Sequence, residues 1–249
     1  MTKVMVLCRP AAYIRIMKTI GQLAIEEPKA IAVLEKLSID YCCHGNRTVA
    51  EACRDAGISE QELLSAIGSA PAGTDARDWS ASSLKDIQQF IIQTHHVFTR
   101  DMLATVNQLA AKVAQRHAAN HPEVANVHGL VSRLQNDLLP HMMKEEQILF
   151  PYVEELESGE ANPPFFGTVQ NPVHMMMMEH DAAAEILADL RAITANYALP
   201  DDACISFRAL YERLQDLEQD LHRHIHLENN VLFPRAVELE AASSVTSGV

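Results

Sequence analysis

The sequence predicts an all-α protein in which a small helical N-terminal domain precedes an antiparallel four-helix bundle. Three observations predict this class. Glycine is scarce, with 9 residues in 249, and aromatic residues make up only 5% of the chain, a composition that favours helices over sheets. Apolar residues recur at three- and four-residue steps over four long stretches. Ser/Thr–x–x–Glu pairs, which form capping boxes at helix N-termini, precede shorter stretches.

Residues 1–76 are expected to form the small domain, with three short helices between residues 15 and 70. Pro28 opens the first of these helices, since proline is tolerated in a first helical turn. Capping-box pairs open the other two, at Thr48 and Glu51 and at Ser59 and Glu62. The stretch DYCCHGN between the first two helices is turn-like, and residues 69–80 are a predicted linker.

Residues 77–241 are expected to form the bundle. Its four predicted helices cover roughly residues 84–117, 123–155, 173–197 and 201–240. A connection rich in glycine and proline, SGEANPPFFGTVQNP, separates the second helix from the third. Modest connections between long helices are typical of an antiparallel four-helix bundle. The last eight residues, 242–249, are predicted to be a disordered tail.

Composition excludes several partners and settings. The formal net charge of −13 argues against nucleic acid as a partner. No run approaches 18 uninterrupted apolar residues, so no membrane span is expected, and no secretion signal is apparent. The five cysteines are odd in number and form no CxxC pair, which is not the pattern of a disulfide framework. A reducing, cytoplasmic setting is therefore expected.

One eleven-residue pattern occurs twice. HMMKEEQILFP spans residues 141–151 and HIHLENNVLFP spans residues 224–234. In each copy a histidine precedes a glutamate by four residues, so the two side chains lie on one face of a helix. A single such pair is usually a surface contact. Two copies with matching downstream residues predict that both pairs point into the bundle core as metal ligands.

The duplication extends upstream. His96 lies 45 residues before His141, and His180 lies 44 residues before His224. The bundle is thus predicted to consist of two helical hairpins, each contributing one histidine and one His-x-x-x-Glu pair. Four imidazoles and two carboxylates exceed the needs of one tetrahedral zinc and suit two metals, with the carboxylates placed to bridge them. Such a set suits iron, with manganese or zinc as alternatives.

One question remains open from the residues alone. Periodicity does not choose between His95 and His96 as the ligand, because the apolar stripe of that helix passes near both. The remaining histidines are more simply explained as surface or structural residues. Three protein ligands on each metal, with bridges, would leave positions for dioxygen, nitric oxide, peroxide or water.

These residues resemble a known family. The paired motifs are similar to those of the iron–sulfur cluster repair di-iron proteins, the repair-of-iron-centres family, which have a hemerythrin-like bundle. IDYCCHG, residues 39–45, resembles the double-cysteine signature of that family's N-terminal domain. The resemblance covers nearly all of the chain after about residue 18 and implies a non-haem di-iron centre with two bridging glutamates. Carried over by position, its ligands are His96, His141, Glu145, His180, His224 and Glu228.

The resemblance also implies accessory residues and a function. An aromatic residue usually precedes the first ligand in the family, and His95 holds that place here, which favours His96 as the ligand. Asp137 and Glu179 match acidic residues that line a path to solvent. Cys42 and Cys43 match the cysteine pair and are redox-active, metal-handling or merely small buried residues. His44 replaces the glycine that usually follows the pair.

The implied function is the repair of iron–sulfur clusters damaged by nitric oxide or peroxide, through donation of iron. The partners would be damaged iron–sulfur proteins. The alternative is a hemerythrin-like protein that binds or reduces nitric oxide or dioxygen, as a sensor, carrier or nitric oxide reductase. Whether the protein is an enzyme and whether it forms a homodimer both stay open.

Overall fold

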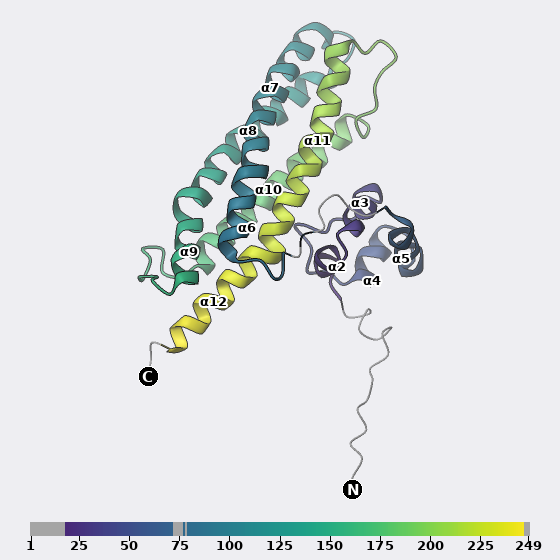
Figure 1. The fold of residues 1–249 in the computed structure, drawn as a ribbon. Coiled ribbons are helices and arrows are strands. Elements are labelled where there is room, and N and C mark those ends of the chain that lie inside the picture. The colour runs from purple at the N-terminus through teal and green to yellow at the C-terminus, as the bar shows by residue number, and fades with distance from the viewer. Residues whose placement is uncertain (1–17, 72–76, 78, 247–249) are drawn as a thin grey trace. The chain divides into compact units, whose positions relative to one another are not determined.

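The structure is a computed structural model that describes residues 18–71, 77 and 79–246. The described residues form helices, turns and loops, and an isolated bridge pairs Thr19 with Thr48 (Figure 1). This confirms the all-α prediction. The chain divides into two compact units, Met1–Ala81 and Ser82–Val249, and each is described by itself. Cys8 lies outside the described residues.

The first unit contains four described helices rather than the three expected. They are α2 (Ile20–Glu26), α3 (Lys29–Lys36), α4 (Val49–Asp55) and α5 (Glu60–Ser69). The predicted capping boxes of Thr48 and Ser59 are present. A third capping box, in which Thr19 pairs with Gln22, opens the unexpected helix α2. Glutamine can replace glutamate in this motif, so the signal for α2 lay in the sequence.

Four long helical segments form the second unit. The first two make up a helical hairpin that ends near residue 158. The first comprises α6 (Leu84–Phe90), η1 (Ile91–His96) and α7 (Val97–His117), and the second comprises α8 (Glu123–Lys144), η2 (Glu145–Leu149) and α9 (Phe150–Ser158). The third is α10 (Gln170–Ile193), and the fourth comprises α11 (Ile205–Leu227), η3 (Glu228–Leu232) and α12 (Phe233–Thr246). Figure 1 shows α7, α8, α10 and α11 running side by side as the predicted bundle.

Three short π-helical segments interrupt these long helical segments, and they were not predicted from the sequence. In η2 the backbone N–H of Phe150 donates to the carbonyl of Glu145, and in η3 that of Phe233 donates to the carbonyl of Glu228. Both bonds span five residues instead of four. Pro151 and Pro234 follow at once, and proline lacks an N–H and crowds the carbonyl four residues earlier. The repeated Leu-Phe-Pro therefore favours a local widening of each helix, a feature frequent at functional sites.

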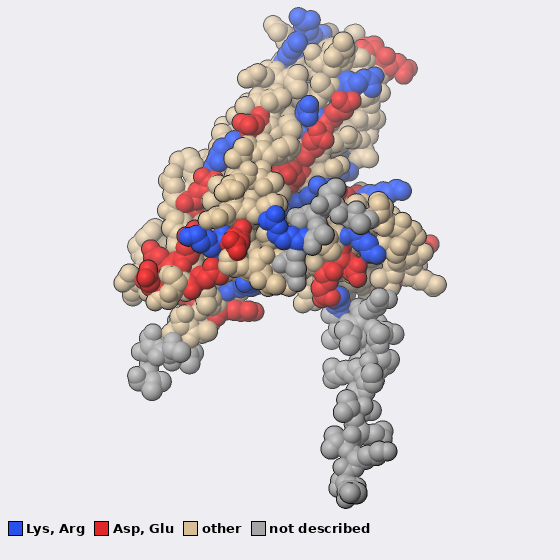
Figure 2. All heavy atoms as spheres, viewed as in Figure 1, with Lys and Arg blue, Asp and Glu red and all other residues tan. Residues whose placement is uncertain are grey.

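An apolar core fills one part of the bundle. Its fully buried members include Leu103, Leu134, Leu190, Phe207 and Leu214. Figure 2 shows Asp and Glu interspersed with Lys and Arg on the visible face. None of the described helices is long and apolar enough to cross a membrane.

The ends of the units differ slightly from the predicted domain limits. The second unit begins at Ser82, whereas the predicted bundle domain begins at residue 77. Helix α12 continues to Thr246, into the segment 242–249 that was expected to be disordered, and residues 247–249 lie outside the described part of the chain. The domain limits of 1–76 and 77–241 stay a prediction.

Truncation of the apolar core should be costly. Leu190 is fully buried, so Leu190→Ala should lower the free energy of unfolding by about 2–5 kcal/mol through lost burial and the cavity left behind. The control is Ile205→Ala, because Ile205 is 89% exposed and its loss should change stability by less than about 0.5 kcal/mol. Urea unfolding measures both. Equal effects would contradict the assigned core.

Candidate metal centre

Six ionisable side chains meet inside the bundle, in the part that contains the π-helical segments. His96 ends η1, His141 lies in α8, His180 in α10 and His224 in α11, while Glu145 and Glu228 begin η2 and η3. Each of the six is at most 2% exposed. Side chains of this kind are rarely buried without partners, so their contacts with one another decide the chemistry of the site.

The four imidazoles face each other in two pairs. Nε2 of His96 lies 3.1 Å from Nε2 of His224, and Nε2 of His141 lies 3.0 Å from Nε2 of His180. Two nitrogen ligands that each lie about 2 Å from one metal ion are themselves about 3 Å apart. Each pair therefore has the spacing of two ligands on one ion.

The two carboxylates each span both pairs. Oε1 of Glu145 lies 3.3 Å from Nε2 of His141, and its Oε2 lies 3.4 Å from Nε2 of His96. Oε1 of Glu228 lies 3.1 Å from Nε2 of His224, and its Oε2 lies 3.2 Å from Nε2 of His180. One oxygen of each carboxylate thus faces each imidazole pair. This is the arrangement of a bridging carboxylate.

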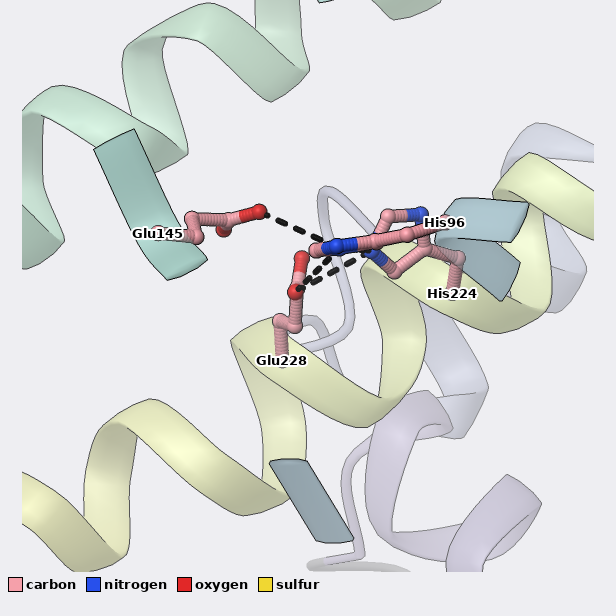
Figure 3. Close-up of side chains that lie close together, drawn as sticks. All are labelled: His96, Glu145, His224 and Glu228. Atoms are coloured by element: carbon pink, nitrogen blue, oxygen red, sulfur yellow. Dashed lines mark hydrogen bonds and ion pairs between the residues drawn. The ribbon is translucent and has the colours of Figure 1, made fainter. Parts of the chain in front are cut away.

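The six residues form two overlapping groups whose ligand atoms lie within 4.8 Å of one another. We call the group of His96, His224 and the two glutamates site 1, and the group of His141, His180 and the two glutamates site 2. Figure 3 shows the four side chains of site 1 converging, with His224 and Glu228 from one continuous helical segment and His96 and Glu145 from two others.

The unsatisfied atoms of this cluster fit a bound cation. Both carboxylate oxygens of Glu145 and Oε2 of Glu228 are buried without a hydrogen bond among the described residues. An uncompensated buried carboxylate costs several kcal/mol. Imidazole nitrogen and carboxylate oxygen are ligands that suit iron, so the donor set of the cluster fits a non-haem iron site.

Charge coupling inside the cluster is strong. Burial alone would lower the pKa of His141, but the Glu145 carboxylate outweighs it and raises that pKa to about 10. Burial and the charge of Glu228 oppose ionisation of Glu145, yet His141 lowers its pKa to about 2. The Glu228 pKa is likewise lowered, by His224 and His180 against burial. Without metal, the charge of the Glu145 carboxylate is therefore compensated by the protonated imidazole of His141, whereas burial lowers the pKa of His224.

The outer nitrogens of three histidines are held by neighbouring side chains. Nδ1 of His96 lies 2.6 Å from Oε1 of Glu146, and Nδ1 of His141 lies 2.8 Å from Oε2 of Glu179. Nδ1 of His180 lies 2.9 Å from Oδ1 of Asn229. Such contacts fix the orientation of a ligating imidazole and leave Nε2 free for the metal.

Two of these outer carboxylates extend toward solvent. Glu146 also accepts a bond of 2.7 Å from Arg100, and Glu179 pairs with Lys144. The Glu146 and Glu179 side chains are 24% and 30% exposed. They connect the buried imidazoles to the surface of the bundle.

The phenylalanine of each repeated motif stacks on a ligand. The ring of Phe150 lies parallel to His96 at 6.0 Å between centroids, and that of Phe233 lies parallel to His180 at 6.1 Å. In each hairpin, two residues of the motif therefore contact the first histidine of that hairpin: the phenylalanine stacks on its ring, and the residue after the glutamate contacts its Nδ1. These contacts explain why the two motifs also match after the His and Glu ligands.

The structure brings together all six predicted ligands, whereas two other candidates, His95 and Asp137, belong to neither group of ligand atoms. His95 is buried, but its Nδ1 contacts Oδ1 of Asp220 at 3.0 Å, and it belongs to neither group. Asp137 is 52% exposed and pairs with Arg133 at 3.7 Å, so it lies apart from the cluster. Glu179 does contact a predicted ligand.

Two contributors to the site, Glu146 and Asn229, were not predicted from the sequence. Each directly follows a glutamate of the cluster, Glu145 or Glu228. The shared position within the repeat was the available signal, although the two residues differ in type. Comparing the two motifs position by position, rather than only at matching letters, would have found them.

The cysteine pair lies in the first unit, in a loop organised by Asp40. Its carboxylate accepts bonds from the backbone N–H groups of Cys42 and Cys43 and contacts Nδ1 of His44 at 2.6 Å. The Cys42 thiol donates a hydrogen bond of 3.8 Å to Sγ of Cys43, and neither cysteine forms a disulfide. The contact with Cys43, together with burial, raises the pKa of Cys42 well above its usual value, so Cys42 is a neutral thiol here.

His44 does not strain the loop that follows the cysteines. It is not among the described residues with positive φ, so its backbone does not require glycine. Its side chain is 64% exposed. His44 therefore places an imidazole next to the cysteines in a backbone conformation that does not need glycine.

Comparisons with known proteins agree with this geometry. A family model described as the hemerythrin HHE cation binding domain matches residues 89–236, and a second, ScdA_N, a domain of unknown function, matches residues 16–71. The first match contains every residue of the cluster.

Full-length relatives share both regions. An iron–sulfur cluster repair protein YtfE from Pectobacterium carotovorum is 36% identical over 229 residues, covering 90% of this chain and 98% of that protein. One from Musicola paradisiaca is 36% identical over 231 residues, with the same coverage. One from Escherichia coli O157:H7 is 34% identical over 218 residues, covering 88% and 96%. The chain therefore belongs to the hemerythrin HHE family, in the group of the YtfE iron–sulfur cluster repair proteins.

Proposed function

We propose that this protein repairs damaged iron–sulfur clusters by supplying iron from a labile non-haem di-iron centre. The observation that carries the proposal is the bridging geometry, in which each of two buried carboxylates directs one oxygen at each of two imidazole pairs. The names of the relatives give the repair role. Nitrosative and oxidative stress are the conditions under which such clusters need repair.

The proposed ligands are two histidines for each iron, with the two glutamates shared between the irons. Site 1 offers His96 and His224, and site 2 offers His141 and His180. Four protein ligands at each iron leave further coordination positions, since iron commonly takes more than four. Bound iron would supply redox chemistry there, while the chain positions the imidazoles and excludes water from them.

The chain's own residues prepare the site for both loading and release. The contacts from Glu146, Glu179 and Asn229 direct Nε2 of three histidines inward. When iron is absent, the proton on His141 compensates the charge of Glu145. Metal binding at His141 must then displace this proton. Loss of iron would let the proton return, so that the Glu145 charge stays compensated.

A gas-binding role is the second candidate, because positions left open on iron also suit dioxygen or nitric oxide. Hemerythrin-like carriers usually have a fifth histidine. In the described part of the chain, His95 is the nearest candidate, but it is bonded to Asp220 and belongs to neither site. This favours repair over gas carriage. The damaged iron–sulfur proteins would be the partners.

Removing a ligand should remove iron. The wild type should bind about two irons per chain. We expect the variants His141→Ala and Glu145→Ala to bind clearly less iron and to lose the ability to repair a damaged iron–sulfur protein. Iron is counted colorimetrically after anaerobic loading. His117→Ala is the control: His117 is half-buried and contacts Sγ of Cys204 at 3.2 Å, apart from the cluster. Full iron content in both ligand variants would refute the ligand assignment.

Reduction should release the iron. Anaerobic reduction of the loaded protein, in the presence of a weak ferrous chelator, should transfer iron to the chelator, because imidazole and carboxylate ligands would hold ferrous iron less firmly than ferric iron. The measurement is the iron per chain before and after reduction. Two irons retained throughout would instead favour the gas-binding role.

The stability of the metal-free protein should fall at alkaline pH. The His141 pKa is raised from 6.5 to about 10, so its stabilising contribution is complete below pH 6.5 and is lost as the pH rises through 10. Urea unfolding of metal-free protein at pH 6.5 and pH 9.5 measures this fall. In His141→Gln the fall should be smaller. An equal or larger fall in the variant would contradict the coupling between His141 and Glu145.

A further inference from the structure

The four histidines of the cluster are not supported equally. Three of them have a hydrogen-bonding partner at the outer nitrogen: Glu146 for His96, Glu179 for His141 and Asn229 for His180. Nδ1 of His224 is buried and has no such partner among the described residues. Both histidines of site 2 are therefore supported, but only one histidine of site 1 is.

The internal repeat explains where the missing partner would lie. Glu179 directly precedes His180 and contacts His141, the ligand of the other hairpin. The corresponding residue of the first hairpin is His95, which directly precedes His96. Its ring stacks parallel to His224, with centroids 5.5 Å apart and 1° between the planes. A stacked ring offers no acceptor to Nδ1.

His95 also engages the nearest carboxylate. Asp220 lies one turn before His224 on α11, and its Oδ1 contacts Nδ1 of His95 at 3.0 Å. The other oxygen, Oδ2, is buried without a hydrogen bond. Neither oxygen of Asp220 thus bonds to His224 in this arrangement.

We infer that the two irons differ in lability, and that the iron of site 1 is the one given up first, because His224 lacks an outer partner. This inference rests on the proposed function. A metal at Nε2 leaves the ring proton of His224 at Nδ1, where it is buried without an acceptor, and an unmade buried hydrogen bond is costly. Without metal the proton can reside on Nε2, 3.1 Å from Oε1 of Glu228.

The experiment follows iron release in time. Full-length protein loaded with two irons is reduced anaerobically and mixed with excess of a chromogenic ferrous chelator. We expect two phases of about one iron each, with rates that differ by about 10- to 100-fold, the usual effect of an outer partner on metal affinity. Both irons leaving in one phase would overturn the inference.

Variants assign the phases to the sites. Asn229→Leu removes the outer partner of His180 and should accelerate the slow phase while the fast phase stays unchanged. Asn229→Asp keeps an acceptor and should preserve the slow phase. The matched control is Asn230→Leu, because the amide of this neighbouring residue contacts Nδ1 of His226 at 3.1 Å, and it should change neither phase. Acceleration of the fast phase by Asn229→Leu would reverse the assignment and overturn the inference.

A second variant covers the case in which Asn229→Leu does not fold. His95→Gln keeps a donor for Asp220 and adds an amide oxygen that can accept from His224. The fast phase should then slow, and an unchanged fast phase would overturn the inference. The iron count separates this outcome from failure of the proposed function. Fewer than two irons, or two irons that never leave, would refute the proposed function, whereas two that leave together refute only the inequality of the sites.

Discussion

Two fully buried carboxylates are the constraint on which the second unit depends. Glu145 and Glu228 are both 0% exposed, and each would cost several kcal/mol if it were not compensated. Compensation comes from four imidazoles on four separate helical segments. The helices must therefore be long, antiparallel and aligned so that these residues meet at one level. The rest of the bundle can be filled with ordinary apolar packing.

The repeated motif meets this constraint in the same way twice. In each copy the glutamate spans both imidazole pairs, the next residue contacts the outer nitrogen of a histidine, and the phenylalanine stacks on that same ring. Proline then prevents normal helical bonding, and the helix widens at the glutamate. The π-helical segments η2 and η3 therefore belong to the same repeated motif that contains the ligands.

The features that the sequence predicted best are those with a strong period or an exact repeat. The long helices follow from apolar spacing, and the meeting of His96, His141, His180 and His224 follows from the duplicated hairpin. Contacts that depend on the direction in which a side chain points around its helix axis were harder to predict. Asp137 and Glu179 looked alike as acidic neighbours, yet Asp137 is exposed and Glu179 reaches His141. Both residues lie in regular α-helices, α8 and α10, so their directions depend on how each helix is rotated about its axis in the bundle, which the spacing of apolar residues does not define to a single residue.

The contacts at Nδ1 of the histidines bear on whether the centre holds its iron permanently or gives it away. A centre meant only to hold metal would gain from a partner on every imidazole, as His141 and His180 have. A centre that gives iron away must also tolerate its absence. Here the Glu145 charge is compensated by the protonated His141 when no cation is bound, and Glu146 and Glu179 connect His96 and His141 to solvent. A proton on His141 can therefore replace part of the compensation that iron would give, and the same fold serves the loaded and the empty protein.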